Sequence, residues 1–151
     1  MTIYVDADAC PVKEEVYRVA ARYAIPVVLV ANSRMRVPEG GGVRLQIVAG
    51  GQLDSADDWI AARAGAADIV VTADVPLASR CVAAGAHAID PRGRVYTEDS
   101  VGDALATRNL MAQLREAGTI SGGGPAPLAK RERSLFLQRL DEQIQQIGRS
   151  R

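Results

Sequence analysis

The sequence predicts a single α/β domain built on a mainly parallel sheet. A length of 151 residues, 48% of them apolar, suits one domain with its own core. Val27–Val30 is a continuous apolar run, which is typical of a parallel strand buried on both faces. A helical pattern separates this run from an earlier β-rich run, Thr2–Val5, and a strand–helix–strand order implies parallel pairing.

The remaining elements of the sheet follow from local patterns. Pro11 suits the first turn of a helix, which we expect to continue to about Ala24. Val43, Leu45 and Ile47 alternate with polar residues, which predicts a half-exposed strand at an edge of the sheet. The other expected elements are a helix from Asp54 to Ala64, a strand Ile69–Thr72, a helix from Pro76 to a stop at Gly85, and a strand His87–Ile89.

The last third of the chain has the pattern of a helical extension of the same domain. Pro91–Arg94 is expected to form a turn, and helical patterns cover Val101–Ala117 and about Lys130–Ile147. Between these helices lies Ser121–Pro127, where three consecutive glycines predict a loop that is mobile without a ligand. We therefore assign one domain, residues 1–151, with an extension from about residue 100 onward.

Composition and charge exclude several protein classes. The 18 basic and 18 acidic residues balance, so net charge indicates no polyanionic partner. No apolar run is long enough to span a membrane, and the first residues lack the pattern of a signal peptide. The two cysteines form no CxxC pair, which argues against a zinc knuckle. We expect a cytoplasmic location, and the sequence does not indicate the oligomeric state.

Acidic residues fall at equivalent places in this layout. Asp6 and Asp8 follow the first strand, Asp54 and Asp57 open the second helix, and Asp74 follows the fourth strand. Open parallel sheets bind ligands beyond the carboxyl ends of their strands, where carboxylates that come together repel one another. Mg²⁺ or Mn²⁺ suits oxygen ligands and usually completes its shell with water and substrate phosphate. The pattern therefore points to phosphoryl transfer or phosphodiester hydrolysis.

Most of these acids also have a structural interpretation. Asp74 precedes a Val-Pro pair and suits a helix N-cap, and Asp54 with Asp57 resembles a capping arrangement. Asp8 is a candidate cap of the first helix. Asp6 is different, because it ends a strand, a position where aspartate is depleted. Asp6 is therefore the strongest candidate for a functional acid.

The segments Val5–Lys13, Asp54–Asp57 and Asp68–Ala78 closely resemble the bacterial YaiI/YqxD family. The resemblance continues through Pro91–Gly93, the helix Arg108–Gly118 and the loop Gly123–Pro125, and so covers nearly the whole chain. The family is grouped by fold with PIN-like nuclease domains, which hold Mg²⁺ or Mn²⁺ with acids at these strand ends. The resemblance therefore implies a three-layer PIN-like α/β fold with a mainly parallel sheet and a helical C-terminal extension.

The resemblance also implies roles for single residues. Asp6 matches the leading acid of PIN-like domains, Asp74 the acid of a Thr-x-Asp segment, and Asp57 the acid at the start of the central helix. These three are the expected catalytic residues, and Asp8 and Asp54 join them in the expected set of metal ligands. A Val-Pro pair follows Asp74 where the usual PIN pattern has a further acid.

The predicted function is a divalent-metal-dependent nuclease that acts on RNA. Lys13 lies near the acidic end of the sheet, and Arg92 and Arg94 lie in a turn. All three are expected to contact substrate phosphates. The alternative is a non-catalytic RNA- or protein-binding module that keeps a degenerate metal site.

Two single motifs resemble those of other enzyme classes. Asp6-Ala7-Asp8 resembles the DxD motif of haloacid-dehalogenase-like phosphatases, but that chemistry needs a lysine and later paired acids, and Lys130 lies in a different setting. Cys10, near a helix N-terminus, and His87, the single histidine, are a conceivable nucleophilic pair. A buried structural role is the simpler explanation of both residues.

Overall fold

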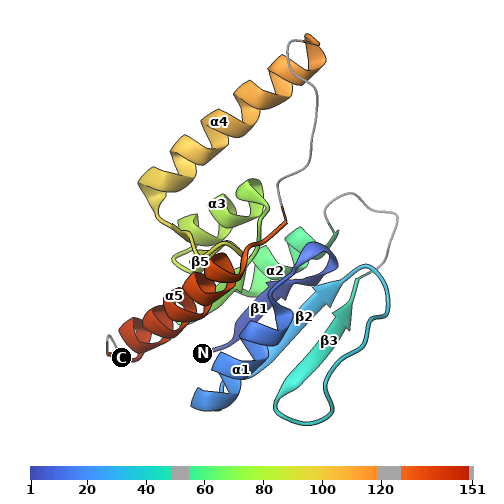
Figure 1. Cartoon of the computed structure of the whole chain (residues 1–151), viewed down its shortest axis with the longest axis vertical. Coiled ribbons are helices and arrows are strands. Elements are labelled where there is room, and N and C mark those ends of the chain that lie inside the picture. The colour runs from blue at the N-terminus through green and yellow to red at the C-terminus, as the bar shows by residue number, and fades with distance from the viewer. Residues whose placement is uncertain (49–54, 119–126, 150–151) are drawn as a thin grey trace.

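The computed structural model describes residues 1–48, 55–118 and 127–149. Among these residues a six-stranded sheet has the strand order β3-β2-β1-β4-β5-β6 (Figure 1). The strands are β1 (Ile3–Asp6), β2 (Val27–Ala31), β3 (Val43–Ile47), β4 (Ile69–Val71), β5 (His87–Ile89) and β6 (Val95–Tyr96). Every pairing is parallel except that of β5 with β6. The predicted parallel sheet, with β3 at its edge, is confirmed.

Helices cover both faces of the sheet and complete three layers. They are the 3₁₀ helix η1 (Ala7–Ala9), α1 (Lys13–Tyr23), α2 (Ser55–Arg63), α3 (Val75–Ala83), α4 (Glu98–Glu116) and α5 (Lys130–Arg149). α1 and α5 pack together on one face, and α2 and α3 cover the other. α4 contacts α3 and extends away from the sheet (Figure 1). The predicted helical C-terminal extension is therefore present.

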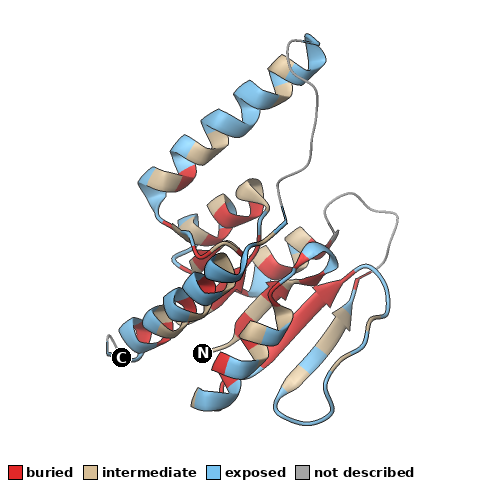
Figure 2. Ribbon diagram, viewed as in Figure 1, coloured by how far each residue is buried: buried red, intermediate tan, exposed pale blue. Residues whose placement is uncertain are grey.

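The apolar run of β2 shows how the sequence determines these layers. Val27 and Leu29 belong to the core beneath α1 and α5, whereas Val28 and Val30 belong to the core beneath α2 and α3. Successive side chains of a strand point to opposite faces of the sheet, and here both faces are covered. Figure 2 shows the buried centre of the sheet in red and the exposed outer length of α4 in blue. A continuous apolar run is the sequence that such a strand requires.

The largest differences from the predicted elements concern β6 and the start of α4. β6 was not predicted, because it is two residues long and depends on its antiparallel pairing with β5. α4 begins at Glu98 rather than Val101, because Thr97 and Ser100 form a reciprocal capping box.

Two sequence predictions fall on residues that are not described. Asp54, an expected metal ligand, is one of them. The expected mobile loop Ser121–Pro127 is the other, apart from Pro127 itself, which is exposed. In the three described ranges, no helix has the length and apolar character needed to cross a bilayer.

Asp141 joins α5 to α1 at the surface of the core that lies beneath these two helices. Its carboxylate accepts hydrogen bonds from Tyr23 Oη at 2.6 Å and from Arg22 Nη1, both on α1. Gln145 of α5 donates a further hydrogen bond at 2.6 Å. The Tyr23 hydrogen bond is the main reason that the pKa of Asp141 lies below its usual value, and Gln145 and Arg22 act in the same direction.

We predict that Asp141→Asn lowers the free energy of unfolding at neutral pH by about 1–3 kcal/mol, because charge-assisted hydrogen bonds are replaced by weaker ones. A depressed carboxyl pKa stabilises the fold above the unfolded-state pKa of about 4, and this contribution disappears as pH falls through the folded-state value. Urea unfolding at a series of pH values should show the two proteins converging below about pH 4. A stability difference that does not change with pH would contradict this account.

Glu142→Gln is the matched control for this experiment. Glu142 lies on the same helix, but its carboxylate is about half exposed, at 48%, and pairs with Arg139 at 3.4 Å. The loss of such a surface pair should change the free energy of unfolding by less than about 0.5 kcal/mol.

Candidate functional site

Parallel pairing brings Asp6 next to Thr72. Val5 of β1 is paired with Val71 of β4, so the residue that follows each of them lies at the carboxyl edge of the sheet. Thr72 is buried, and its Oγ1 donates a hydrogen bond to Asp6 Oδ2 at 2.9 Å. The same oxygen accepts a hydrogen bond from the backbone N–H of Asp74 at 2.9 Å. One hydroxyl therefore connects Asp6 to the segment that carries Asp74.

Asp74 has a structural role at this edge. Its Oδ1 accepts a hydrogen bond from the backbone N–H of Leu77 at 3.1 Å, so Asp74 is the N-cap of α3, as the capping interpretation predicted. In the described part of the chain, no hydrogen bond is donated to Asp74 Oδ2 or to Asp6 Oδ1. Each of the two acids thus has one oxygen in a structural bond and one oxygen that can bind a ligand.

Asp8 connects the 3₁₀ helix to the end of β2. It lies in η1, and its Oδ2 and Oδ1 accept the backbone N–H of Asn32 at 3.0 and 3.3 Å. The N-cap position of α1 is occupied by Val12, so the interpretation of Asp8 as the cap of the first helix is wrong. The reason is that Asp8 lies within η1, and residues 10–12 separate η1 from the start of α1.

The electrostatics of Asp6 show that these acids lie near one another. Burial is the largest cause of a raised pKa at Asp6, the Thr72 hydrogen bond opposes it, and the charges of Asp74 and Asp8 raise the pKa further. The ionised form of Asp6 is therefore less favoured, relative to its neutral form, than it is for an aspartate in water. A cation close to these three carboxylates would offset that cost.

The structure places Asp57 on the first turn of α2, where it is half-buried. Its charge acts on Arg80 and Cys81 of α3, and the neighbouring Asp58 forms an ion pair with Arg80 at 2.7 Å. α2 also contacts β1. Over residues 1–48, 55–118 and 127–149, no group of three Asp, Glu, His or Cys side chains is arranged to hold a metal ion.

The predicted phosphate contact Lys13 has a structural role in the folded chain. Its Nζ donates hydrogen bonds to the carbonyl oxygens of Ala7 and Cys10, at 3.3 and 3.0 Å. These bonds satisfy two carbonyl groups of η1 and its C-cap. Burial raises the pKa of the Cys10 thiol, which is the opposite of what an activated cysteine nucleophile needs. The Lys13 side chain is therefore bound to the backbone of the 3₁₀ segment that carries Asp8.

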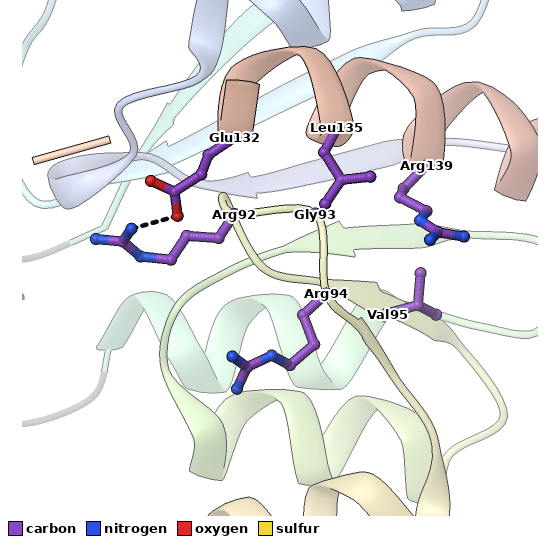
Figure 3. Close-up of a pocket in the computed structure, with 7 residues that line it drawn as sticks. All are labelled: Arg92, Gly93, Arg94, Val95, Glu132, Leu135 and Arg139. Carbon is purple, nitrogen blue, oxygen red and sulfur yellow. Dashed lines mark hydrogen bonds and ion pairs between the residues drawn. The ribbon is translucent and has the colours of Figure 1, made fainter. Parts of the chain in front are cut away.

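Arg92 and Arg94 lie in a turn that follows β5, as predicted. Because β5 is parallel to β4, this turn lies at the same edge of the sheet as Thr72. Arg92 forms an ion pair with Glu132 of α5 (Figure 3). The Arg94 side chain is exposed, and within the described residues its guanidinium makes neither a hydrogen bond nor an ion pair.

Sequence reasoning did not give Thr72 a role. The sequence did contain a signal, because Thr72 is a polar residue at the end of an apolar strand. In the structure its side chain is buried. Glu132 gave no such signal, because its partner Arg92 is 40 residues away in the sequence.

Comparison with known proteins shows the family. The family model described as "Uncharacterized BCR, YaiI/YqxD family" matches residues 4–146. The UPF0178 protein bll3966 of Bradyrhizobium diazoefficiens is 55% identical over 149 residues, which are 99% of this chain and 88% of the relative. The UPF0178 protein RPA2191 of Rhodopseudomonas palustris is 56% identical over 149 residues, which are 99% of this chain and 93% of the relative.

A third relative extends the same comparison to another organism. The UPF0178 protein of Nitrobacter winogradskyi is 54% identical over 148 residues, which are 98% of this chain and 93% of the relative. No solved structure matches the chain. Because the family model and these relatives cover almost all of the sequence, the chain belongs to the YaiI/YqxD family.

Proposed function

We propose that this protein is a divalent-metal-dependent nuclease that acts on RNA, with Asp6 at the centre of its site. The observation that supports this most is the environment of Asp6, a half-buried carboxylate whose pKa is raised by burial and by Asp74 and Asp8. Open parallel sheets bind ligands at this edge. The resemblance to PIN-like domains, which hold metal ions with acids at these strand ends, supports the same function.

The donor set suits Mg²⁺ or Mn²⁺, because it consists of carboxylate oxygens. Asp6 and Asp74 would hold the ion through the oxygens that are not engaged by Thr72 and Leu77. Mg²⁺ is often bound by only one or two carboxylates together with water and substrate phosphates. Such a site needs no group of three acids, which the described residues lack. Asp8, Asp54 and Asp57 remain predicted ligands.

The chain's own residues fix this site before any ligand binds. Each acid accepts a hydrogen bond from a fixed donor. The donors are the Thr72 hydroxyl for Asp6, the Leu77 N–H for Asp74 and the Asn32 N–H for Asp8. Fixed carboxylates lose little freedom when they bind an ion. A bound divalent ion would lower the pKa of a water molecule and stabilise the leaving oxygen of a phosphodiester. The positive charges of Lys13 and Arg94 at the same edge favour an anionic substrate.

An RNA-binding module without catalysis is the second candidate. Two observations favour it: the described residues contain no group of three acids suited to a metal, and Arg94 is an exposed cation without a described partner. Such a module would bind RNA through phosphate contacts alone. The two candidates differ in whether a divalent ion binds and whether RNA is cleaved.

We predict that Asp6→Asn keeps or raises the melting temperature of the metal-free protein. The raised pKa of Asp6 means that its charge destabilises the fold above that pKa, and asparagine retains an oxygen that can accept the Thr72 hydrogen bond. Wild-type protein should gain about 2.7 kcal/mol when Mn²⁺ exceeds its Kd a hundredfold. The variant should gain little, because it lacks an anionic ligand. Calorimetry of the wild type and of the variant, each with and without Mn²⁺, measures these melting temperatures.

Asp58→Asn is the control for this experiment, because Asp58 is an exposed acid on the same turn as Asp57 and pairs with Arg80. It should respond to Mn²⁺ like the wild type. If Asp6→Asn lowers stability and Mn²⁺ changes neither protein, Asp6 is only a structural residue.

We predict that wild-type protein cleaves labelled single-stranded RNA in the presence of Mn²⁺ and stops when EDTA is added. Asp6→Asn and Asp74→Asn should each lower the cleavage rate by at least about 100-fold, because each removes a charged metal ligand. Asparagine remains a good N-cap at position 74, so α3 should stay folded. Asp58→Asn should cleave normally. Wild-type protein that binds RNA but cleaves none with Mn²⁺ or Mg²⁺ would exclude the nuclease and leave the binding module.

A further inference from the structure

A hollow of about 510 Å³ lies between the turn after β5 and the helix α5 (Figure 3). Its lining residues are Arg92, Gly93, Arg94, Val95, Glu132, Leu135 and Arg139. Binding sites for small molecules typically have volumes of about 300–1,000 Å³. The hollow is therefore large enough to take a small ligand or one unit of a polymer.

Backbone hydrogen bonds hold the turn that forms one wall of the hollow. Asp90 Oδ1 accepts the backbone N–H groups of Arg92 and Arg94, both at 2.9 Å, and the backbone N–H of Asp90 donates to the carbonyl of Arg94 at 2.9 Å. Gly93 has a φ of +93°, and a Cβ at this position would lie 2.9 Å from Leu135 Cγ. Only glycine allows this approach to α5 without strain. The backbone of Arg92 and Arg94 is therefore held in place next to α5.

The hollow has an excess of positive charge. It contains three arginines and one glutamate, and Glu132 is engaged by Arg92 and by the backbone N–H of Ala129. Arg139 has a single weak ion pair, at 3.4 Å, with the half-exposed Glu142. The Arg94 guanidinium has no hydrogen-bond or ion-pair partner among the described residues. Arg94 and Arg139 can therefore both contact an anion.

Two apolar side chains, Leu135 and Val95, also line the hollow. Figure 3 shows Leu135 and Arg139 on α5, whereas the Arg94 side chain extends from the turn away from α5. Leu135 is 38% exposed, which makes it one of the few large apolar side chains at the described surface, and Val95 is half-buried beside it. A ligand that combines an apolar part with negative charge suits this lining. A nucleotide has both.

The hollow is close to the acids at the edge of the sheet. Its turn follows β5, which lies beside β4, the strand that leads to Thr72 and Asp74. The charges of Arg94 and Asp74 both act on the Tyr96 hydroxyl, so both lie near that ring. A chain of nucleotides can therefore contact the hollow and the acids together.

We propose that this hollow binds one nucleotide of a single-stranded RNA, with the base on Leu135 and Val95 and the phosphates on Arg94 and Arg139. This inference rests on the proposed function and adds to it the position of the substrate strand. Proteins bind single-stranded RNA by packing exposed bases on side chains and by contacting phosphates with arginine. The strand then continues from the hollow to Asp6 and Asp74.

The test is binding of a short fluorescently labelled single-stranded RNA in EDTA, measured by anisotropy at several salt concentrations. Arg94→Gln and Arg139→Gln should each weaken binding by about tenfold, since each removes a charged contact. Each should also reduce the slope of log affinity against log salt by about one. Leu135→Ala should weaken binding without changing that slope, because it removes only apolar contact. Melting temperatures should show that all three variants remain folded.

Arg149→Gln is the matched control, because Arg149 is an exposed arginine at the other end of α5 and the change in net charge is the same. The inference is overturned if Arg94→Gln and Arg139→Gln bind RNA as tightly as Arg149→Gln, or if wild-type protein binds no RNA. Because no metal is present, the result does not depend on cleavage. Pocket-dependent RNA binding without cleavage supports the pocket and contradicts the nuclease.

Discussion

The parallel pairing of β1 with β4 is the constraint on which the proposed site depends. It aligns two strands so that Asp6 and Thr72, which are 66 residues apart in the sequence, form a hydrogen bond at one edge of the sheet. Thr72 then contacts the backbone of Asp74, where α3 begins. A shift of one residue in this register would turn the apolar side chains of β1 to the wrong layers. The packing of the two cores on the faces of the sheet therefore also determines where the acids lie.

The ionised form of Asp6 does not help the stability of the fold. A carboxylate that is half-buried and lies near Asp74 and Asp8 is less stable as an anion than one in water, and a single hydroxyl only partly compensates. A structural hydrogen bond to Thr72 could be made by a neutral side chain. An acid at this position is understandable if a cation or a proton is handled there. The arginines of the neighbouring turn add positive charge to the hollow beside α5.

The elements were predictable from the sequence because their signals are local. The unbroken apolar run of β2, the alternation in β3 and the one-sided face of α5 each report which surfaces are covered. The sequence predicted that Asp6 and Asp74 share an edge if their strands are neighbours, and the structure shows β1 beside β4. The links between side chains were not predictable, since those of Thr72 with Asp6 and of Arg92 with Glu132 join distant parts of the chain. The role of Lys13 was missed because η1 was not foreseen.

The most direct test of the central claim is the titration of the Asp6 carboxyl carbon by NMR, with and without Mg²⁺. We expect the metal-free protein to show a pKa above the ordinary value of 3.8. Mg²⁺ should lower that pKa, because a bound cation favours the carboxylate. Thr72→Val should raise the metal-free pKa further, and Thr72→Ser should leave it unchanged, since serine keeps the hydroxyl that stabilises the anion. An Asp6 that titrates at its ordinary pKa and does not respond to Mg²⁺ would contradict the account.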